Sequence, residues 1–195
     1  MTEHSDGGEA VTASSSIRLG SSIDVVASVP YLLGFAPADS LVLVFFARQS
    51  NRLVVTGRVD YPRVVADQGT VFAQCRCVFA SAVKAGATGV HVIAYPPVGA
   101  EAVATDERDS ARALCLRLVA MAKAADLTVL GSGFVTANHW FDSSLPDTGG
   151  VMFDPAATAV AAGFVSKGVS YLPDREALRA RVVGPPTDLA RDVKH

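Results

Sequence analysis

The spacing of hydrophobic and polar residues divides the chain into alternating helices and strands. After Ser21 and Ser22, which can cap a helix, apolar residues recur at partly helical spacing until Gly34, a typical helix-ending residue. Pro30 lies inside this segment, and because proline lacks a backbone N–H, we expect a break or a second short turn there. The apolar run that follows predicts a buried strand over residues 41–48.

The middle of the chain continues with a hairpin and two further elements. Polar residues at 49–51 predict a turn, and the alternation over 52–60 predicts a return strand, so the two strands form a β-hairpin. Helical spacing follows from about Val64 or Gln68 to Ala85. The segment GVHVIAY, residues 89–95, then predicts a second buried strand that Pro96 and Pro97 end.

The second half of the chain repeats this alternation of helices and strands. Thr105 can cap a helix whose first turn carries the acidic residues Asp106 and Glu107, as the helix dipole favours. The pattern then predicts a strand over 127–136 with a bulge or bend at its Gly-Ser-Gly, short strands at 139–141 and 151–153, a helix from Asp154 to about Gly163, and a last helix over 175–182 capped by Asp174.

This order of elements predicts the fold class. Strands separated by helices of crossover length indicate parallel pairing, and the hairpin adds an antiparallel pair. We therefore expect an α/β protein with a single domain over 17–183, in which helices flank a mixed β-sheet. Residues 1–16 are small and polar and predict a disordered tail, and residues 184–195 predict a C-terminal tail.

Composition and charge narrow the classes of partner. Of the 195 residues, 50% are hydrophobic and 18% are charged, which is typical of a globular domain with a well-filled core. The net charge of −2 and the pI of about 6.0 give no basic field, so we expect no nucleic-acid partner. The longest apolar run is far shorter than the roughly 18 residues of a membrane span, and no secretory signal precedes it. We expect a soluble, cytoplasmic protein without membrane contact.

The cysteines and histidines give no sign of a cofactor. Cys75, Cys77 and Cys115 are odd in number and lie in predicted helices, which is typical of buried apolar residues rather than a disulfide framework. No pair of metal-binding residue types has ligand spacing, and neither GxGxxG nor GxxxxGK[ST] occurs. We therefore expect no metal, no cofactor and no catalytic constellation.

The corner Asp39-Ser40, between two apolar segments, is the first candidate site. In a functional interpretation, the carboxylate and hydroxyl lie at the edge of the sheet beside the ring of Tyr31. In a structural interpretation, which we favour, one of the two side chains bonds backbone amides and fixes the start of the strand.

His139 and Trp140 form the second candidate site. A catalytic arrangement of Ser40, His139 and either Asp60 or Asp142 is conceivable, but the GxSxG spacing of a nucleophile elbow is absent. We therefore favour a packing tryptophan with an exposed histidine beside it.

Three segments resemble one family. IRLGSSIDVVASVPYLLGFAPADSLVLVFF, KAGATGVHVIAY and AAGFVSKGVSYLPDREALRARV are similar to DUF4192, an uncharacterised family of actinobacteria and their phages, and the resemblance covers about residues 17–183. It implies the amino-terminal domain of the longer members. The cysteines that relatives carry after the tryptophan are missing from FDSSLPDTGGVMFD, so no role built on them carries over. The resemblance implies no activity and no catalytic residue.

Two functions follow as hypotheses. The first is a non-enzymatic interaction or regulatory module, self-associating as a homodimer or bound to a protein partner, which for a phage protein would be a host protein. The second is an enzyme that binds a small molecule or nucleotide at the carboxyl ends of the strands, where Asp39, Ser40, Asp60 and Tyr95 would converge.

Overall fold

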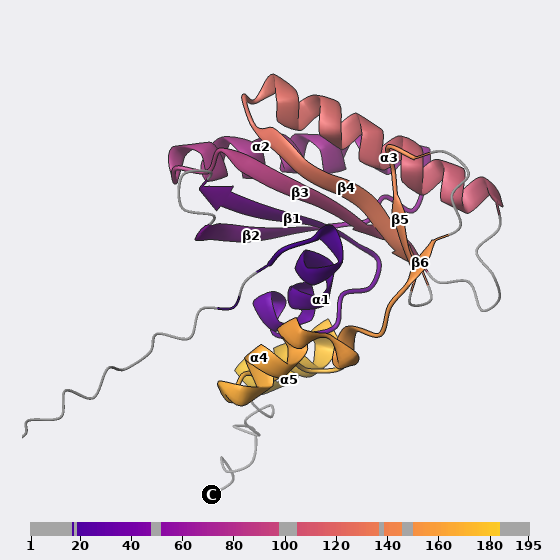
Figure 1. The fold of residues 1–195 in the computed structure, drawn as a ribbon. Coiled ribbons are helices and arrows are strands. Elements are labelled where there is room, and N and C mark those ends of the chain that lie inside the picture. The colour runs from indigo at the N-terminus through magenta and orange to yellow at the C-terminus, as the bar shows by residue number, and fades with distance from the viewer. Residues whose placement is uncertain are drawn as a thin grey trace, which may run out of the picture.

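The computed structural model describes residues 17, 19–47, 52–97, 105–136, 139–145 and 150–183. In this part the chain forms a single α/β domain with helices on both faces of a six-stranded mixed sheet, which confirms the predicted fold class (Figure 1). The strands have the order β2-β1-β3-β4-β5-β6, and their bounds are β1 Ser40–Ala47, β2 Arg52–Asp60, β3 Gly89–Tyr95, β4 Thr128–Thr136, β5 His139–Asp142 and β6 Val151–Met152. The predicted tails, the hairpin turn at 49–51 and the loop residues 146–149 lie outside the described residues.

The sheet contains one parallel pair, β3–β4, and its other pairs are antiparallel. β1 lies between β2 and β3 and is antiparallel to both, so β2 and β3 run in the same direction without being neighbours. The crossover helix between them therefore predicts their common direction but not their separation by β1. The sequence predicts the bulge or bend at Gly131-Ser132-Gly133, and the register of β3 against β4 shifts one residue earlier, between the pairs Val90–Val129 and His91–Gly131.

Two long helices cover one side of the sheet, the α2–α3 face. They are α2 Gln68–Lys84, preceded by a short 3₁₀ turn, and α3 Thr105–Ala124. The apolar stripes predicted for them pack on alternate residues of the central strands, such as Leu43 and Val92, and form the larger core cluster. None of the helices in the described ranges combines the length and the apolar character that a membrane span requires.

Helix α1, Ser22–Leu33, covers the opposite side, the α1 face. Its predicted start is confirmed, because Ser21 accepts a hydrogen bond from the Asp24 backbone N–H at 3.1 Å and Asp24 completes a capping box. Gly34 ends it with φ of 80°, as predicted. The predicted break at Pro30 is wrong: the helix continues through the proline because residues on both sides of it pack on the sheet, which offsets the one lost backbone hydrogen bond.

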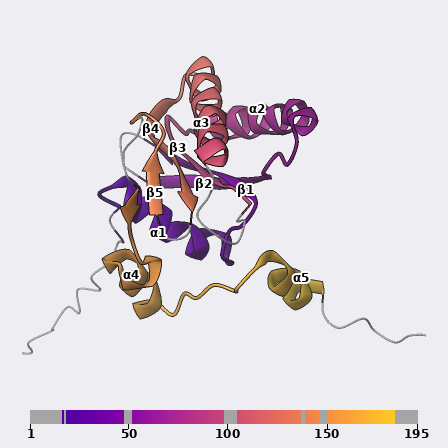
Figure 2. The ribbon, with the colours of Figure 1, turned by 90° about the vertical axis from the view of Figure 1, so that its right-hand side faces the viewer.

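The C-terminal segment, residues 153–183, lies beneath the α1 face (Figure 1). Asp154 and Pro155 open only a 3₁₀ turn, Pro155–Ala157, so the prediction of one helix to Gly163 is wrong. Thr158 caps the separate helix α4, Ala159–Ser166, because its hydroxyl accepts from the Ala161 N–H at 3.1 Å. The chain then runs extended to α5, Arg175–Val183, with Asp174 capping it as predicted (Figure 2).

Aromatic and backbone contacts join this segment to α1. The ring of Tyr31 stacks on Phe164 with centroids 4.7 Å apart and meets Tyr171 edge-on at 4.9 Å. Leu172 exchanges two backbone hydrogen bonds with the corner after α1, to the Gly34 carbonyl at 2.8 Å and from the Ala36 N–H at 2.9 Å. The C-terminal segment is therefore packed and hydrogen-bonded against α1 as part of the domain.

Candidate functional site

A row of residues crosses the α1 face where β3 and β4 end. Ser40 pairs with Tyr95, the pairing of β3 with β4 ends at Ala94 and Phe134, one residue before Tyr95 and Val135, and Val135 pairs with Trp140. Tyr95 and Trp140 belong to the apolar cluster on this face, and Val135 packs against it. The row lies at the carboxyl ends of the parallel strands, the place where α/β sheets commonly bind ligands.

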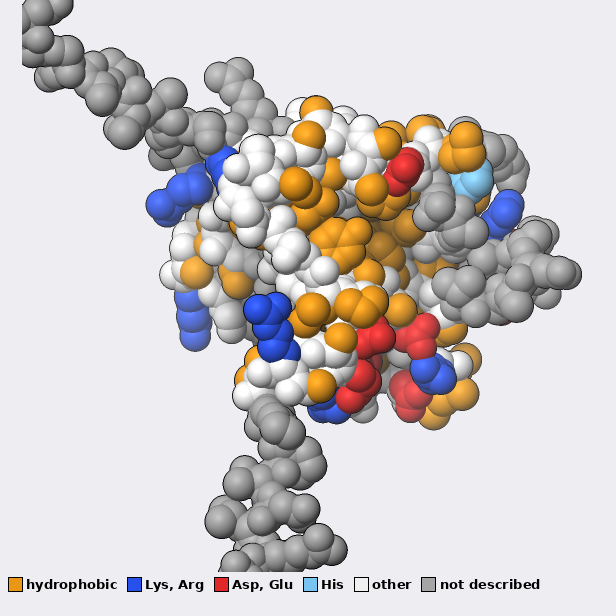
Figure 3. All heavy atoms as spheres, turned by 90° about the horizontal axis from the view of Figure 1, so that it is seen from below, with side chains coloured by type: hydrophobic (Ala, Val, Ile, Leu, Met, Phe, Trp, Pro, Cys, Tyr) orange, Lys and Arg blue, Asp and Glu red, His pale blue; other side chains and the backbone are white. Residues whose placement is uncertain are grey.

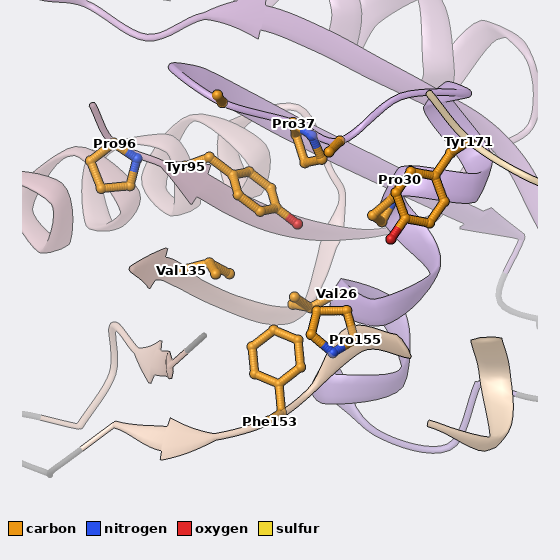
Figure 4. A pocket seen from close by; sticks show the side chains of 11 residues that line it. Val26, Pro30, Pro37, Tyr95, Pro96, Val135, Phe153, Pro155 and Tyr171 are labelled. Carbon is orange, nitrogen blue, oxygen red and sulfur yellow. The ribbon is translucent and has the colours of Figure 1, made fainter. Parts of the chain in front are cut away.

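A pocket of about 320 Å³ opens against this row (Figure 4). Its walls come from separate parts of the sequence. Helix α1 contributes Val26 and Pro30, the corner after the helix contributes residues 36–38, and the strand ends contribute Tyr95, Pro96 and Val135. The corner that the sequence singles out therefore does line a cavity, but with Ala36, Pro37 and Ala38 rather than with Asp39 and Ser40.

The C-terminal segment supplies the remaining wall. Phe153, Pro155 and Tyr171 lie across the pocket from the sheet. Seen from below, the pocket is a hollow floored by apolar side chains, with acidic side chains gathered along one side of it (Figure 3). The sequence gives no signal for these three residues, because they meet the strand ends only through the return of the chain beneath α1.

The lining offers binding surface and little reactive chemistry. Its eleven residues are apolar or phenolic, and no acid, base, thiol or amine occurs among them. The two polar side chains are Tyr95 and Tyr171, and Figure 4 shows both hydroxyls facing the pocket. Burial raises the pKa of Tyr95 well above its usual value, so its hydroxyl stays protonated and can donate a hydrogen bond.

The corner residue Asp39 adopts a left-handed backbone conformation with φ of 45°. Its carbonyl accepts a hydrogen bond from the Tyr61 N–H at 2.9 Å, and its carboxylate pairs with the guanidinium of Arg63. The favoured interpretation of the sequence is that Asp39 or Ser40 bonds backbone amides, and instead Asp39 pairs with Arg63 while the Ser40 hydroxyl donates to the Ala38 carbonyl. The Asp39 side chain ties two loops together at the surface, outside the pocket lining.

Ser40 and Asp60 are cross-strand partners held by arginine. The hydroxyl of Ser40 donates to the Ala38 carbonyl at 2.5 Å and accepts from Nε of Arg58 at 2.8 Å. Asp60 pairs with the same arginine at 2.6 Å and with Arg175 of α5 at 3.4 Å. Arginine cannot take the hydroxyl proton, so this cluster positions β1, β2 and α5 and does not activate a nucleophile.

His139 and Ser40 do not come together. They lie on strands β5 and β1, with β3 and β4 between them, which separates their backbones by about 14 Å at ordinary strand spacing. Trp140 faces the α1 side, so its neighbour His139 faces the other side, where its ring lies 6.3 Å from that of Phe141. Asp142 instead accepts from Ser144 in a local turn. The conceivable catalytic arrangement does not form.

The cysteines and potential metal ligands show no reactive cluster. In the described ranges, no three His, Cys, Asp or Glu residues gather closely enough to hold a metal ion. Burial raises the pKa of the Cys75 thiol to about 11 and that of Cys115 to about 12, so both remain protonated. Tyr31, another predicted binding residue, lies outside the pocket lining and instead holds Tyr171 in place.

The family comparison identifies the chain's class. Residues 23–195 match the family described as Domain of unknown function (DUF4192), and the chain therefore belongs to that family. The match starts inside α1 and includes the α1 face, the corner and the whole C-terminal segment. No curated protein and no solved structure matches the chain.

Proposed function

We propose that this protein is a non-enzymatic regulatory or interaction module that binds a mainly apolar group in the pocket at the carboxyl ends of β3 and β4. The character of the lining carries this proposal. A volume of about 320 Å³ lies at the low end of the range of small-molecule sites, about 300 to 1,000 Å³, and apolar walls with a few polar groups are typical of them. Four of the lining residues are prolines, whose fixed backbones favour a preformed site.

The enzyme hypothesis receives less support from the same geometry. It requires Asp39, Ser40, Asp60 and Tyr95 to converge, and of these only Tyr95 lines the pocket. The two carboxylates are engaged by arginines, and the Ser40 hydroxyl donates to a backbone carbonyl. A site made of apolar walls and protonated phenols favours binding over general acid–base chemistry at neutral pH. The homodimer, the protein partner, the actinobacterial or actinophage source and the cytoplasmic location stay predictions.

The test compares ligand binding by a variant in which the pocket is partly filled with binding by a variant that carries the same substitution elsewhere. We expect diphenylmethane, an apolar two-ring probe, to raise the melting temperature of the wild type and to change the emission of Trp140, the chain's one tryptophan, which shares a cluster with Tyr95 and Phe153. Ala36→Leu places a larger side chain in the pocket wall and should weaken binding at least tenfold.

Ala113→Leu is the control, because Ala113 is exposed on α3, on the opposite side of the sheet. It adds the same atoms and should leave probe binding unchanged. Circular dichroism and the melting temperature without probe establish that both variants are folded. No response in the wild type, or an equal response in Ala36→Leu and Ala113→Leu, would contradict the proposal.

A further inference from the structure

The polar atoms in the pocket specify more about its occupant than the apolar walls do. Tyr95 is only 9% exposed, and its hydroxyl faces the pocket space together with that of Tyr171. The hydrogen bonds of the described residues include none from either hydroxyl, and neither oxygen is fully buried, because the fully buried side-chain oxygen without a partner in that part of the chain belongs to Thr56. A donor confined to an apolar cavity loses much of its hydration, so a ligand that supplies an acceptor there gains a hydrogen bond that an apolar ligand does not.

The charges around the pocket argue against an ionic ligand. The lining contains no charged side chain, and the nearby carboxylates of Asp39 and Asp60 already pair with Arg63, Arg58 and Arg175. A carboxylate group on the ligand would leave water without meeting a positive charge in the lining, and an ammonium group would meet only carboxylates such as Asp39 and Asp60 that arginines already neutralise. The occupant that fits is therefore neutral.

The shape of the walls favours rings. Phe153, the phenol rings and the prolines present flat, stiff surfaces, and such surfaces bury a rigid ring at a low cost in conformational entropy. The acceptor is best supplied by a carbonyl oxygen, because its two lone pairs let both phenols donate at once, whereas a ligand hydroxyl would use one of the phenols as an acceptor.

We infer that the pocket takes a neutral ring compound bearing a carbonyl oxygen, and that Tyr95 donates a hydrogen bond to this oxygen with Tyr171 assisting from the C-terminal segment. The inference rests on the proposed binding function and names the ligand class of the same site. Tyr95 is the main donor because it is more deeply buried than Tyr171. Tyr171 forms the opposite wall of the site, and its ring is held by contact with Tyr31.

Three probes of matched shape test the inference: benzophenone, diphenylmethane, which has a methylene group in place of the carbonyl, and the anion diphenylacetate. By isothermal titration and Trp140 emission, we expect wild-type protein to bind benzophenone about tenfold more tightly than diphenylmethane, with no measurable binding of diphenylacetate. That tenfold preference is the gain expected from one net hydrogen bond.

Tyr95→Phe removes only the hydroxyl oxygen, and it should reduce the affinity for benzophenone to that for diphenylmethane while leaving the latter unchanged. Tyr171→Phe should have the same effect to a smaller extent. Tyr61→Phe is the matched control, because Tyr61 packs against the core on the α2–α3 face, and it should bind all three probes as the wild type does. Photolabelling by benzophenone should mark peptides that contain pocket residues.

The outcomes separate this inference from the function on which it rests. If benzophenone and diphenylmethane bind equally, or if Tyr95→Phe keeps the preference, the inference is overturned, and the binding function stands if Ala36→Leu weakens probe binding at least tenfold while Ala113→Leu does not. Tight binding of diphenylacetate overturns the neutral class. If no probe binds the wild type, or if labelling falls outside the pocket, the binding function itself fails and the inference fails with it.

Discussion

The two faces of the sheet are built from the same strands and are covered in different ways. On β1, Leu41, Leu43 and Phe45 contact the α2–α3 face, while the alternate residues Val42 and Val44 contact the α1 face. The first face meets helices of 17 and 20 residues. The second meets one helix of 12 residues with an internal proline, and then a segment of short turns and extended chain.

Under the proposed function, this difference divides the sheet into one face that stabilises the fold and another face that binds a ligand. Long amphipathic helices present continuous apolar stripes, which fill the space above a sheet to the density of a protein core. An irregular cover cannot match the sheet along its whole length, and here it leaves the pocket at the carboxyl ends of β3 and β4. The contrast predicts that equal substitutions on the two faces have unequal effects.

The largest expected effect is on the α2–α3 face. Phe79 is 1% exposed and meets Phe45 edge-on with ring centroids 6.0 Å apart, so Phe79→Ala should lower the free energy of unfolding by about 4 kcal/mol. Phe153→Ala on the pocket wall should cost about half as much, because one side of that ring already faces open space. Urea denaturation measures both values, and equal losses would contradict the contrast between the faces.

A second prediction concerns the loss of stability in acid, which we expect from His91 on the α1 face. His91 lies beside Phe46, with ring centroids 5.8 Å apart, and burial lowers its pKa from 6.5 to about 4. The folded state therefore resists protonation that the unfolded chain accepts. The contribution of His91 to the free energy of unfolding is complete above about pH 6.5. It is lost as the pH falls to about 4, and the total loss is about 3 kcal/mol.

His91→Gln removes this titration and should flatten the dependence of stability on pH in that window. Stability curves of the wild type and the variant, measured by chemical denaturation at each pH, isolate the effect as a difference between the two proteins. Parallel curves between pH 6.5 and pH 4 would show that protonation of His91 is not what destabilises the protein in acid.

The smallest expected effect concerns the corner beside the pocket. Asp39→Ala should cost about 1 kcal/mol, because alanine tolerates φ of 45° less well than aspartate does. Asp39→Asn tolerates that conformation and loses only the exposed pair with Arg63, so it should stay within about 0.5 kcal/mol of the wild type. Thermal denaturation measures both variants. A variant that melts like the wild type yet loses probe binding would show that the carboxylate serves the pocket directly.

Much of the fold follows from local sequence signals. The bounds predicted for β2 and β3 match the structure, because polar turn residues and prolines mark where these strands stop. Ser21 and Gly34 fix the ends of α1 through capping chemistry that is local to the chain. The prediction at Pro30 fails because burial against the sheet, which is a tertiary effect, offsets the helix-breaking tendency of proline.

The pocket could not be predicted in the same way. Val26, Tyr95, Val135, Phe153 and Tyr171 are far apart in the sequence, and no spacing rule relates them. Of these, Tyr95 alone is a predicted binding residue, chosen because it ends a buried strand. Candidate sites based on polar residues point mainly to the corner and to His139, whereas the cavity is apolar and its polar atoms come from Tyr95 and from Tyr171, which no sequence pattern singles out.

The backbone bridge between Phe35 and Leu172 has a consequence for the order in which the molecule is completed during translation. The ribosome releases β1 to β4 and both helices of the α2–α3 face long before it releases Tyr171. The larger core can therefore form on the nascent chain while the α1 face is covered by α1 alone and still lacks the C-terminal segment. The pocket is therefore complete only after Tyr171 has emerged, later than the strands and the helix that form its other walls.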